Sequence, residues 1–553
     1  MKNNSLIWIL RNIRRRIPAL LVLTAAQVGN ALFGVFFALG TRGVIDSAVA
    51  GDPRQFFRAC CIQGGIIAGI LICLTVSRHL RDRLNADLER DWKQQLLHGL
   101  LHGDYAAVSG YHSGELLNRL NNDVAKVNEG VLSILPGFAS MATKLVAAVV
   151  VLGILDGRFT AIVAALGGLV VVATAMMRQR LKELNKQVST LDGKVSGFLQ
   201  EIMEKLLMVQ AMDVTDEVEH RSDALLADRY EIQRKRKNVS LLTNTGISLM
   251  YYGAGFAALC WCSFHLLTGA MTFGSLTAVI QLVNQLQTPF VNLSGILPQY
   301  VAMVASAERL MELDGIQGEP APQTEDPQAL YGALSAIEAE ELTFSYDRDV
   351  ILDMAAFTLP KGAFAVITGP SGIGKSTLLK LLLGIFRADS GQLHLRCGDR
   401  KIPVDRSTRR LFAYVPQGNL LLSGTLLENL TIIKPSATQE EIRQALHVSC
   451  MEDFLPQLPL GLGTVLGESG AGLSEGQAQR LAIGRAVLGG APILLLDECT
   501  SALDADTERK VLERIKALPD ITAIAVTHRK AAMDIADWRM EVENGKINAK
   551  PSR

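Results

Sequence analysis

Six apolar segments fill most of the first 300 residues and restrict the possible folds more than any other feature. They lie near residues 18–41, 58–78, 132–155, 159–178, 243–267 and 274–297. Each contains about 20 largely apolar residues, the length that an α-helix needs to cross the hydrocarbon core of a bilayer. Buried core helices of a soluble protein are the alternative. The sequence predicts an all-α, six-helix transmembrane domain.

The connections between these segments alternate in length and charge. The third and fourth segments are joined only by 156–158, and the fifth and sixth only by 268–272, whereas 79–131 and 179–242 are long, charged and helical in pattern. Lysine and arginine crowd the long connections and the N-terminus, where residues 4–15 are typical of an interfacial helix. We therefore expect a multi-pass membrane protein with both long connections in the cytoplasm, most simply in a bacterial inner membrane.

Polar side chains recur at spacings of three and four in the last two segments, which places them on one face of each helix. The set is Gln281, Asn284, Gln285, Thr288, Asn292, Asn244, Ser248 and Tyr251. Because lipid does not solvate such groups, they should face protein or water. Lining of a substrate cavity and hydrogen bonding between helices are both compatible with this pattern.

Composition changes after the sixth segment. Residues 313–334 are rich in Gly, Pro, Gln and acidic residues, as in a linker, and from 335 to 553 strands alternate with helices. This predicts a transmembrane domain over 1–312, the linker, and an α/β domain. The 55 basic and 55 acidic residues balance, so charge gives no reason to expect nucleic acid. The eight cysteines show neither metal-ligand nor disulfide-framework spacing.

A phosphate-binding loop stands near the start of the α/β domain. It follows the apolar run 364–368, precedes a Leu-rich helical segment, and fits the pattern Gly-x-x-x-x-Gly-Lys-Ser/Thr. Its residues are Gly369, Pro370, Ser371, Gly372, Ile373, Gly374, Lys375, Ser376 and Thr377. In such a loop backbone N–H groups surround phosphate oxygens, Lys375 reaches the outer phosphates, and Ser376 offers its hydroxyl to Mg²⁺. This chain is expected to bind a nucleoside triphosphate.

A second apolar run, 493–496, ends in two acidic residues about 120 residues further on. Such a run predicts a buried strand that presents carboxylates at its C-terminal tip. Asp497 is then placed to hold Mg²⁺, directly or through water, and Glu498 to polarise the attacking water.

Between these motifs, Leu473-Ser-Glu-Gly-Gln477 resembles the signature sequence of the ATP-binding cassette (ABC) transporter family. The resemblance covers nearly the whole chain, and the membrane half is similar to an exporter-type half-transporter. It extends to the segments around Tyr346, Gln417, Glu468, Asp504 and His528. Glu475 and Cys499 depart from the commoner Gly and Ala of the family.

The resemblance implies a role for each matching residue. Tyr346 stacks on adenine, Ser376, Gln417 and Asp497 serve Mg²⁺, and Glu498, His528 and Gln417 form the catalytic group. Ser474, Gly476 and Gln477, with Asp504, complete the ATP site on an opposite subunit. Segments 103–110 and 211–221 act as coupling helices. Glu475 adds a negative charge near phosphate, which is expected to weaken closure modestly.

These implications give one function and its alternatives. We expect export of a lipid, drug-like amphipath or peptide, driven by ATP hydrolysis with Mg²⁺, by a homodimer or a heterodimer of half-transporters. An ATP-gated channel or sensor is the main alternative. A soluble cassette ATPase conflicts with the apolar segments, and importers of the common type keep their domains on separate chains. The sequence does not identify the substrate.

Overall fold

A computed structural model describes residues 2–319, 326–346, 349–418, 421–467 and 472–552, with only the backbone described at some helical positions such as 166–178 and 287–295. The chain divides into two units: residues 1–98 with 113–315, and residues 99–112 with 316–553. The second unit therefore includes a short segment of the first long connection. The predicted linker contains the end of one long helix and a short helix, Pro327–Ala333.

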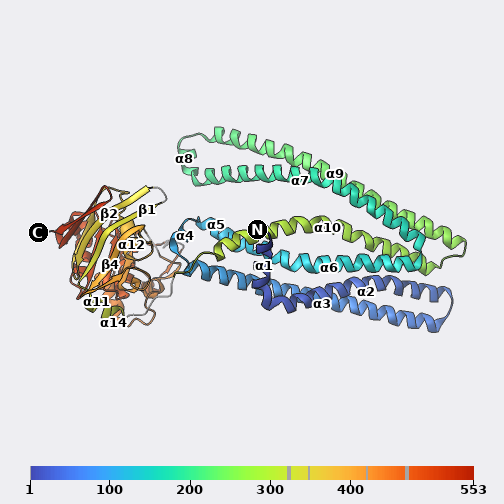
Figure 1. Cartoon of the computed structure of the whole chain (residues 1–553), viewed down its shortest axis with the longest axis horizontal. Coiled ribbons are helices and arrows are strands. Elements are labelled where there is room, and N and C mark those ends of the chain that lie inside the picture. The colour runs from blue at the N-terminus through green and yellow to red at the C-terminus, as the bar shows by residue number, and fades with distance from the viewer. Residues whose placement is uncertain (1, 320–325, 347–348, 419–420, 468–471, 553) are drawn as a thin grey trace. The chain divides into compact units, whose positions relative to one another are not determined.

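Long helices and a few short ones build the first unit (Figure 1). They are α1 (Lys2–Ile13), α2 (Ile17–Val49), α3 (Pro53–His102), α5 (Ser113–Asn118), α6 (Val124–Leu155), α7 (Gly157–Glu204), α8 (Leu206–Ala211), α9 (Thr215–Leu267) and α10 (Phe273–Asp314), with short turns η1 (Arg14–Arg16) and η2 (Arg119–Asp123). The predicted all-α architecture of the N-terminal region is confirmed.

Four helical segments among the described residues are long and apolar enough to cross a membrane. They are Asn4–Val49, Pro53–His102, Ser113–Leu155 and Thr215–Leu267. The other two predicted spans lie within α7 and α10, where many side chains fall outside the described residues. The count of six spans stays a prediction.

An apolar core joins the outer halves of these helices. Its buried members come from five helices: Val35, Ala38, Ala148, Leu152, Phe159, Ala258, Cys262, Ala278, Val279, Leu282, Val283 and Leu286. Small residues such as Ala38, Ala148 and Ala278 let the helix backbones approach closely, as in other membrane helix bundles. Helix α6 packs along α2 and α10, and α7 packs along α9.

The short hairpins are closed by acidic residues. Asp156 Oδ1 accepts hydrogen bonds from the N–H groups of Arg158 and Phe159, both at 3.0 Å, and its Oδ2 accepts one from Trp261 Nε1 at 2.8 Å. Asp46 in α2 accepts from Thr272 Oγ1 at 3.0 Å and from the N–H of Gly274 at 2.9 Å. These bonds satisfy N–H groups that the first turns of α7 and α10 leave unpaired.

A buried ion pair holds the opposite end of this unit. Asp123, in η2, is fully buried and accepts hydrogen bonds from Arg309 Nε at 2.7 Å and Ser306 Oγ at 2.9 Å, both in α10. Arg119 in the same turn pairs with Glu115 and with Glu312. Because an unpaired buried charge is costly, breaking one partner should cost about 3–5 kcal/mol. The network fixes the first long connection to the end of α10.

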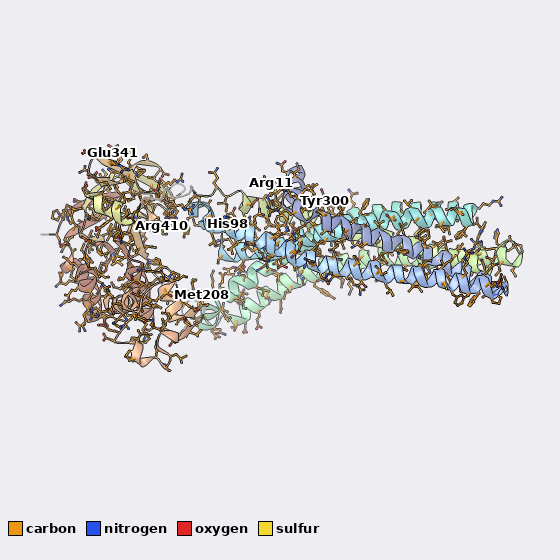
Figure 2. All side chains as sticks on the ribbon, turned by 90° about the horizontal axis from the view of Figure 1, so that it is seen from below. Arg11, His98, Met208, Tyr300, Glu341 and Arg410 are labelled. Atoms are coloured by element: carbon orange, nitrogen blue, oxygen red, sulfur yellow. The ribbon has the colours of Figure 1, made fainter. Side chains whose placement is uncertain are left out.

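The two predicted coupling segments differ in how well they match helices of the structure. Segment 103–110 contains helix α4 (Tyr105–Ser109), and the Tyr105 ring packs edge-on against Phe386 of the nucleotide-binding unit, with ring centroids 5.9 Å apart. Segment 211–221 is not a separate helix, because it runs from the last residue of α8 (Leu206–Ala211) through a turn into the start of α9 at Thr215, and its coupling role stays a prediction. Met208 marks α8 in Figure 2. Asp213, with a φ of +55°, ends the apolar turn, and the acidic start of α9 favours a new helix.

The second unit contains strands in three sheets. A four-stranded antiparallel sheet has the order β2-β1-β4-β5, a six-stranded sheet the order β12-β11-β3-β10-β9-β6, and β7 pairs with β8. The strands are β1 (Ala336–Tyr346), β2 (Asp349–Pro360), β3 (Phe364–Thr368), β4 (Ser390–Cys397), β5 (Arg400–Pro403), β6 (Phe412–Val415), β7 (Gly424–Thr425), β8 (Val465–Leu466), β9 (Ile493–Asp497), β10 (Thr522–Val526), β11 (Trp538–Glu543) and β12 (Lys546–Pro551).

Helices and short 3₁₀ turns connect these strands. They are α11 (Pro327–Ala333), α12 (Lys375–Leu382), η3 (Arg409–Leu411), α13 (Leu426–Thr431), α14 (Gln439–Val448), η4 (Leu455–Gln457), η5 (Gly461–Gly463), α15 (Glu475–Leu488), α16 (Ala505–Lys516) and α17 (Lys530–Ile535). Together with the parallel strands they confirm the predicted α/β domain.

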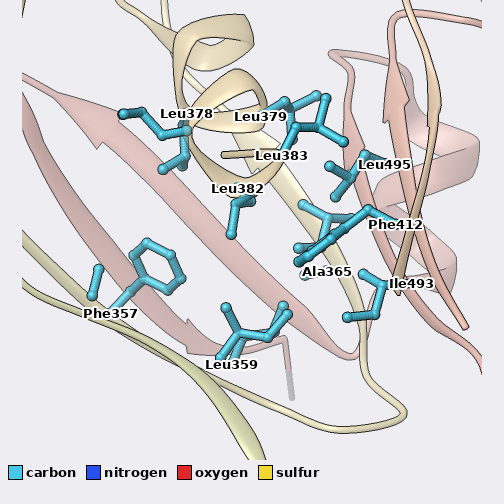
Figure 3. Close-up of a cluster of buried hydrophobic side chains, with 14 of the residues drawn as sticks. Phe357, Leu359, Ala365, Leu378, Leu379, Leu382, Leu383, Phe412, Ile493 and Leu495 are labelled. Carbon is cyan, nitrogen blue, oxygen red and sulfur yellow. The ribbon is translucent and has the colours of Figure 1, made fainter. Parts of the chain in front are cut away.

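Both faces of the six-stranded sheet are buried. Along β3 and β9, alternate residues enter two different cores: Ala365, Ile493 and Leu495 in one, and their sequence neighbours in the other. Figure 3 shows the first core, where Leu378 and Leu382 of α12 face β3, and Phe357 and Leu359 of β2 close the other side. Continuous apolar runs are expected when a parallel sheet is covered on both faces. This explains why 493–496 is wholly apolar.

Candidate active site

Four neighbouring parallel strands bring the predicted site residues to one edge of the sheet. β3, β10, β9 and β6 are adjacent and run in the same direction. The phosphate loop follows β3, His528 follows β10, Asp497 and Glu498 end β9, and Gln417 follows β6. Ligands of open parallel sheets bind outside the carboxyl ends of the strands. Residues as far apart in the sequence as Gly369 and His528 are thereby gathered at the same edge.

The phosphate loop requires glycine at particular positions. Gly369, Gly372 and Gly374 have φ of +148°, +79° and +106°, values that side-chain-bearing residues rarely adopt. A Cβ on Gly374 would lie 2.3 Å from Ile351 Cγ2, and one on Gly369 would lie 2.5 Å from the carbonyl oxygen of Val542. The glycines therefore permit both the turn and the close approach of neighbouring chain segments.

Lys375 begins helix α12 and folds back over the loop. Its Nζ donates hydrogen bonds to the carbonyl oxygens of Gly369 at 2.7 Å and Pro370 at 2.8 Å, and the residue is only 6% exposed. The ammonium is thus held at the loop, next to the N-terminal turn of α12. A positive side chain and a helix N-terminus together favour an anion such as phosphate.

Ser376 and Asp497 form an oxygen pair suited to a hard cation. Ser376 Oγ donates to Asp497 Oδ1 at 3.0 Å, and Tyr414 OH donates to Asp497 Oδ2 at 3.1 Å. Adjacent oxygens around Mg²⁺ at about 2.1 Å lie about 3.0 Å apart in octahedral geometry. The spacing and the donor types therefore fit Mg²⁺, with Ser376 and Asp497 as the residues that would hold it, directly or through water.

Burial affects the protonation of Asp497 and of its hydrogen-bond donor Tyr414. Asp497 is 2% exposed, and burial raises the pKa of its carboxyl, against the opposing effect of the hydrogen bonds from Ser376 and Tyr414. Burial and the neighbouring carboxylate also raise the pKa of Tyr414, which keeps its phenol protonated as a donor. Tyr414 was missed by the sequence reasoning. Its place just before Val415-Pro-Gln417 is the only signal that the sequence carries.

Glu498 and Gln417 meet in front of the sheet edge. Gln417 Nε2 donates to Glu498 Oε2 at 2.6 Å, and the Glu498 N–H donates to the Val526 carbonyl at 3.0 Å. Glu498 has a φ of +46°, in the left-handed region that costs a non-glycine residue energy. The turn directs its carboxylate away from the buried strand. The amide of Gln417 thus contacts the proposed base rather than the Ser376–Asp497 pair.

His528 and Asp504 lie on the neighbouring loops. His528 is exposed, two residues beyond β10. Asp504 caps α16, accepting from the Thr507 N–H at 2.9 Å, and this backbone bond lowers the pKa of its carboxyl. Arg529, next to His528, donates to the carbonyl of Leu503 at 2.6 Å and pairs with Glu508 at 3.2 Å. Arg529 therefore ties the His528 loop to the loop before α16, a role the sequence reasoning did not identify.

The signature residues start a different helix. Ser474 caps α15 in a reciprocal arrangement: its hydroxyl accepts from the Gln477 N–H at 3.3 Å, and the Gln477 side chain accepts from the Ser474 N–H at 2.8 Å. A Cβ on Gly476 would lie 2.8 Å from the Ala502 carbonyl oxygen. Gln479, buried one turn further on, bonds Ser501 and Ala502. In the part of the chain that the structure describes, no hydrogen bond joins residues 474–477 to the phosphate loop.

Tyr346 lies beside the phosphate-loop helix. Thr377 Oγ1 donates to Tyr346 OH at 3.4 Å, and the ring is 40% exposed, with its edge against Phe344 and Phe386. An aromatic ring held in this way presents apolar surface for a flat base. Glu468 lies outside the described residues.

The departures from the family pattern are compatible with the fold. Cys499 is 3% exposed, and burial raises the pKa of its thiol to about 12, so it is an inert core residue. Glu475 is exposed in the first turn of α15, where a negative charge favours the helix. All eight cysteines are free thiols, and Cys61 and Cys260 are exposed.

The polar residues of the membrane unit are only partly placed. Gln285 Nε2 donates to the Gly34 carbonyl at 2.7 Å, which is a bond between helices. The side-chain oxygens of Gln281 and Gln285 are buried without a described hydrogen-bond partner. Asn284, Asn244 and Ser248 are exposed. The side chains of Thr288, Asn292 and Tyr251 lie outside the described residues.

Fold and site define a class: a membrane protein that carries a phosphate-loop ATPase domain on the same chain. Comparison with known proteins gives the family. Residues 17–290 match the family model of the ABC transporter transmembrane region, and residues 352–501 match the ABC transporter model. The chain belongs to the ABC transporter family and is an ATP-hydrolysing exporter of that family.

Individual relatives agree over most of their length. An ATP-dependent lipid A-core flippase of Vibrio cholerae is 24% identical over 536 residues, covering 96% of this chain and 91% of the flippase. A fatty acid ABC transporter ATP-binding/permease protein of Mycobacterium bovis is 28% identical over 443 residues, 79% of this chain and 69% of the relative. A bacterial Atm1-family ABC exporter with ATP bound shares the fold, with a TM-score of 0.78, 21% identity, and coverage of 98% and 95%.

Proposed function

We propose that two half-transporters, each with one membrane unit and one cassette, clamp ATP between their nucleotide-binding units and thereby export an amphipathic molecule from the cytoplasmic side of a bacterial inner membrane. The observation that carries the proposal is the gathering of the phosphate loop, Asp497, Glu498, Gln417 and His528 at one sheet edge. Ser474 lacks any described bond to that loop, although it starts a 14-residue helix with an exposed N-terminus. A second subunit supplies the missing face.

The residues divide the work between binding and hydrolysis. Lys375 and the loop N–H groups bind the phosphates, and Tyr346 stacks on the base. Ser376 and Asp497 would hold Mg²⁺, with Gln417 near it, and the ion would supply positive charge that stabilises the phosphates. Ser474, Gly476 and Gln477 of the second subunit, with Asp504 beside them, complete the site through the α15 N-terminus.

Glu498 acts as the base in hydrolysis. Its carboxylate stands at the end of β9, held by Gln417 at 2.6 Å, where it accepts a proton from the attacking water. His528, on the loop that follows the adjacent strand β10, orders the γ-phosphate. Gln417, which donates to Glu498 in this structure, would help to position the attacking water and would lie near the metal in the closed site. These roles place the chemical step at the edge of the sheet.

Vesicle uptake distinguishes this transporter from an ATP-gated channel. The purified chain, in vesicles with the cassettes outside, should accumulate a fluorescent amphipath when ATP and Mg²⁺ are supplied. A non-hydrolysable ATP analogue should give no accumulation above the level of binding. Equal flux with ATP and with the analogue would instead indicate a gated channel. The same uptake measurement distinguishes a homodimer from a heterodimer. A homodimer transports with this chain alone, whereas a heterodimer transports only when a second subunit is added.

A further inference from the structure

Lys144 is a charged residue in an otherwise uncharged membrane interior. It lies near the middle of the predicted span 132–155. The other basic residues of the six spans, Arg58, Arg78 and Arg178, stand at span ends, and His265 is close to one. None of the six predicted spans contains Asp or Glu. The sequence of the spans therefore offers Lys144 no acidic partner, within one copy or between two copies.

The depth of Lys144 follows from the hairpin ends. It precedes Asp156, the residue that closes the α6–α7 hairpin, by 12 residues, or about 18 Å of helix. The hydrocarbon core is about 30 Å thick, so Lys144 lies close to its middle. A lysine side chain extends about 6 Å, too short to reach the headgroups from there. An ionisable residue at this depth normally faces the bundle interior and has a functional partner.

The helical face of Lys144 also points inward. One turn before it, Ser140 Oγ donates to the Gln27 carbonyl of α2 at 3.2 Å. One and two turns after it, Ala148 and Leu152 are fully buried in the core shared with α2 and α10. Residues four apart lie on one face of a helix, so Lys144 lies between two contacts with the neighbouring helices. The side chain itself is half-buried, and none of the described residues forms an ion pair with it.

Buried acceptors lie at the same depth on α10. Gln285 follows the start of α10 at Phe273 by 12 residues, and its bond partner Gly34 precedes Asp46 by 12 residues. The Gln285 and Gln281 side-chain oxygens are buried and have no hydrogen-bond partner in the described part of the chain. Each such oxygen costs free energy unless a donor meets it. The Lys144 ammonium on α6 and the two glutamine oxygens on α10 therefore lie on helices that pack together.

We propose that Lys144 binds the anionic group, a phosphate or a carboxylate, in the headgroup of the exported amphipath, while the side-chain oxygens of Gln281 and Gln285 accept hydrogen bonds from hydroxyl or amide groups of the same headgroup. The inference rests on the proposed export function and adds its substrate class. The acyl or other apolar part of the molecule is accommodated by the apolar helix surfaces. A neutral or cationic amphipath would leave Lys144 without a counter-charge in a low-dielectric site.

The experiment compares matched amphipaths with the full chain in nanodiscs of neutral lipid. Lysophosphatidylglycerol is paired with the zwitterionic lysophosphatidylcholine, and palmitate with palmityl alcohol, so that each pair differs in net charge but not in its hydrocarbon chain. Dissociation constants come from ligand-induced tryptophan fluorescence, and ATPase stimulation is measured in parallel. The two pairs distinguish a phosphate from a carboxylate. We expect at least one anionic member to bind about 10-fold or more tightly than its partner.

The variants assign that preference to Lys144. Lys144→Gln should weaken binding of the anionic member about 10- to 100-fold and leave the neutral member unchanged. Lys144→Arg should restore the preference, and Lys182→Gln, which removes an exposed charge outside the predicted spans, should have no effect. Basal ATPase activity is expected to stay within about twofold in all three, because none touches the nucleotide site.

Two kinds of result would overturn the proposal. One is an anionic preference that survives Lys144→Gln, or no preference in the wild-type chain. The other is a Lys144→Gln chain that loses dimerisation while its amphipath affinities stay unchanged, which would assign Lys144 to subunit pairing. In either case the proposed export function would still hold, provided that ATP hydrolysis drives uptake. A chain that binds anionic amphipaths through Lys144 but never accumulates them would instead refute export alone.

Discussion

The two units of this chain use polar residues in opposite ways. In the nucleotide-binding unit, polar side chains directly follow each of four adjacent parallel strands, and most of them already contact one another, as Ser376 does Asp497 and Gln417 does Glu498. In the membrane unit, polar groups are spaced along faces of apolar helices, and several of their atoms lack a described partner. Phosphate chemistry demands particular atoms at fixed positions, whereas a substrate cavity demands only shape and a few contacts. The predictions below test this contrast, beginning with the largest expected effect.

Replacement of the proposed base should separate hydrolysis from binding. Glu498→Gln keeps the shape and the bond to Gln417 but removes the proton acceptor, so turnover should fall at least about 100-fold while ATP still binds. Phosphate release and nucleotide binding measure the two effects. Glu513→Gln, an exposed position on α16, is the matched control and should hydrolyse normally. Turnover within tenfold of wild type in Glu498→Gln would remove Glu498 from the catalytic role.

A methyl group in the phosphate loop should be far more harmful than one in an ordinary turn. Gly374→Ala combines a φ of +106° with a Cβ 2.3 Å from Ile351, and we expect about 1–3 kcal/mol of destabilisation together with loss of ATP binding. Gly362→Ala has a similar φ of +78° but open space around its Cβ. Thermal unfolding with and without ATP compares them. Equal losses in the two variants would mean that the contact with Ile351 does not matter.

Two helix caps of the same kind allow the signature to be tested. Ser474 caps α15 and Thr438 caps α14 through the same reciprocal arrangement, so alanine at either should cost about 1 kcal/mol of stability. Only Ser474→Ala should also weaken ATP-dependent dimerisation, by about tenfold, because a lost bond to a charged group costs about 1.5–3 kcal/mol. Light scattering of the Glu498→Gln chain carrying either cap variant measures this. An equal loss of dimer in Ser474→Ala and Thr438→Ala would mean that Ser474 acts only as a structural helix cap.

The buried carboxyl at the tip of β9 should cost stability when it is charged. Because burial raises the pKa of folded Asp497 above its unfolded value, the folded state binds a proton more tightly, and stability is lost as pH rises through that interval. Asp497→Asn should therefore unfold about 2–4 °C higher than wild type at pH 7.5, about 1 kcal/mol for a domain of this size, with a smaller difference near pH 4. It should also lose Mg²⁺-dependent turnover. A lower unfolding temperature at pH 7.5 would contradict the burial argument.

Much of the nucleotide-binding unit could be predicted from sequence because its chemistry leaves few choices. Gly374, Lys375 and Ser376 are required by the loop itself, and the wholly apolar run before Asp497 follows from a sheet covered on both faces. Tyr414 and Arg529 could not be predicted, because a tyrosine or an arginine beside a motif can have many ordinary roles. Tyr414 contacts Asp497 only because β6 packs beside β9, and Arg529 contacts Leu503 only because two loops meet. The reciprocal cap made by Gln477 likewise depends on the three-dimensional turn.

The membrane unit could be predicted only in outline. Apolar length gave the positions of the long helices. The segment 211–221 came from the family resemblance alone, and its composition does not mark the end of α8 at Ala211 or the turn at Asp213. The polar face of 281–292 was compatible with two roles, and Gln285 now has a bond to another helix. Lys144 was overlooked, since a single lysine hardly changes the hydropathy of a 24-residue segment.

The most direct test of the account asks whether one ATP site is shared by two chains. A dimer is purified, through two different affinity tags, from one chain carrying Lys375→Ala and another carrying Ser474→Ala, both with Glu498→Gln. If the phosphate loop of each chain faces the Ser474 of the other, both lesions fall in one site and the second site is intact. We predict about one tightly held ATP per mixed dimer, almost none in the Lys375→Ala homodimer, and only weakly held ATP in the Ser474→Ala homodimer. A mixed dimer that retains no tightly held ATP would mean that each site is completed within a single chain, and it would contradict the account.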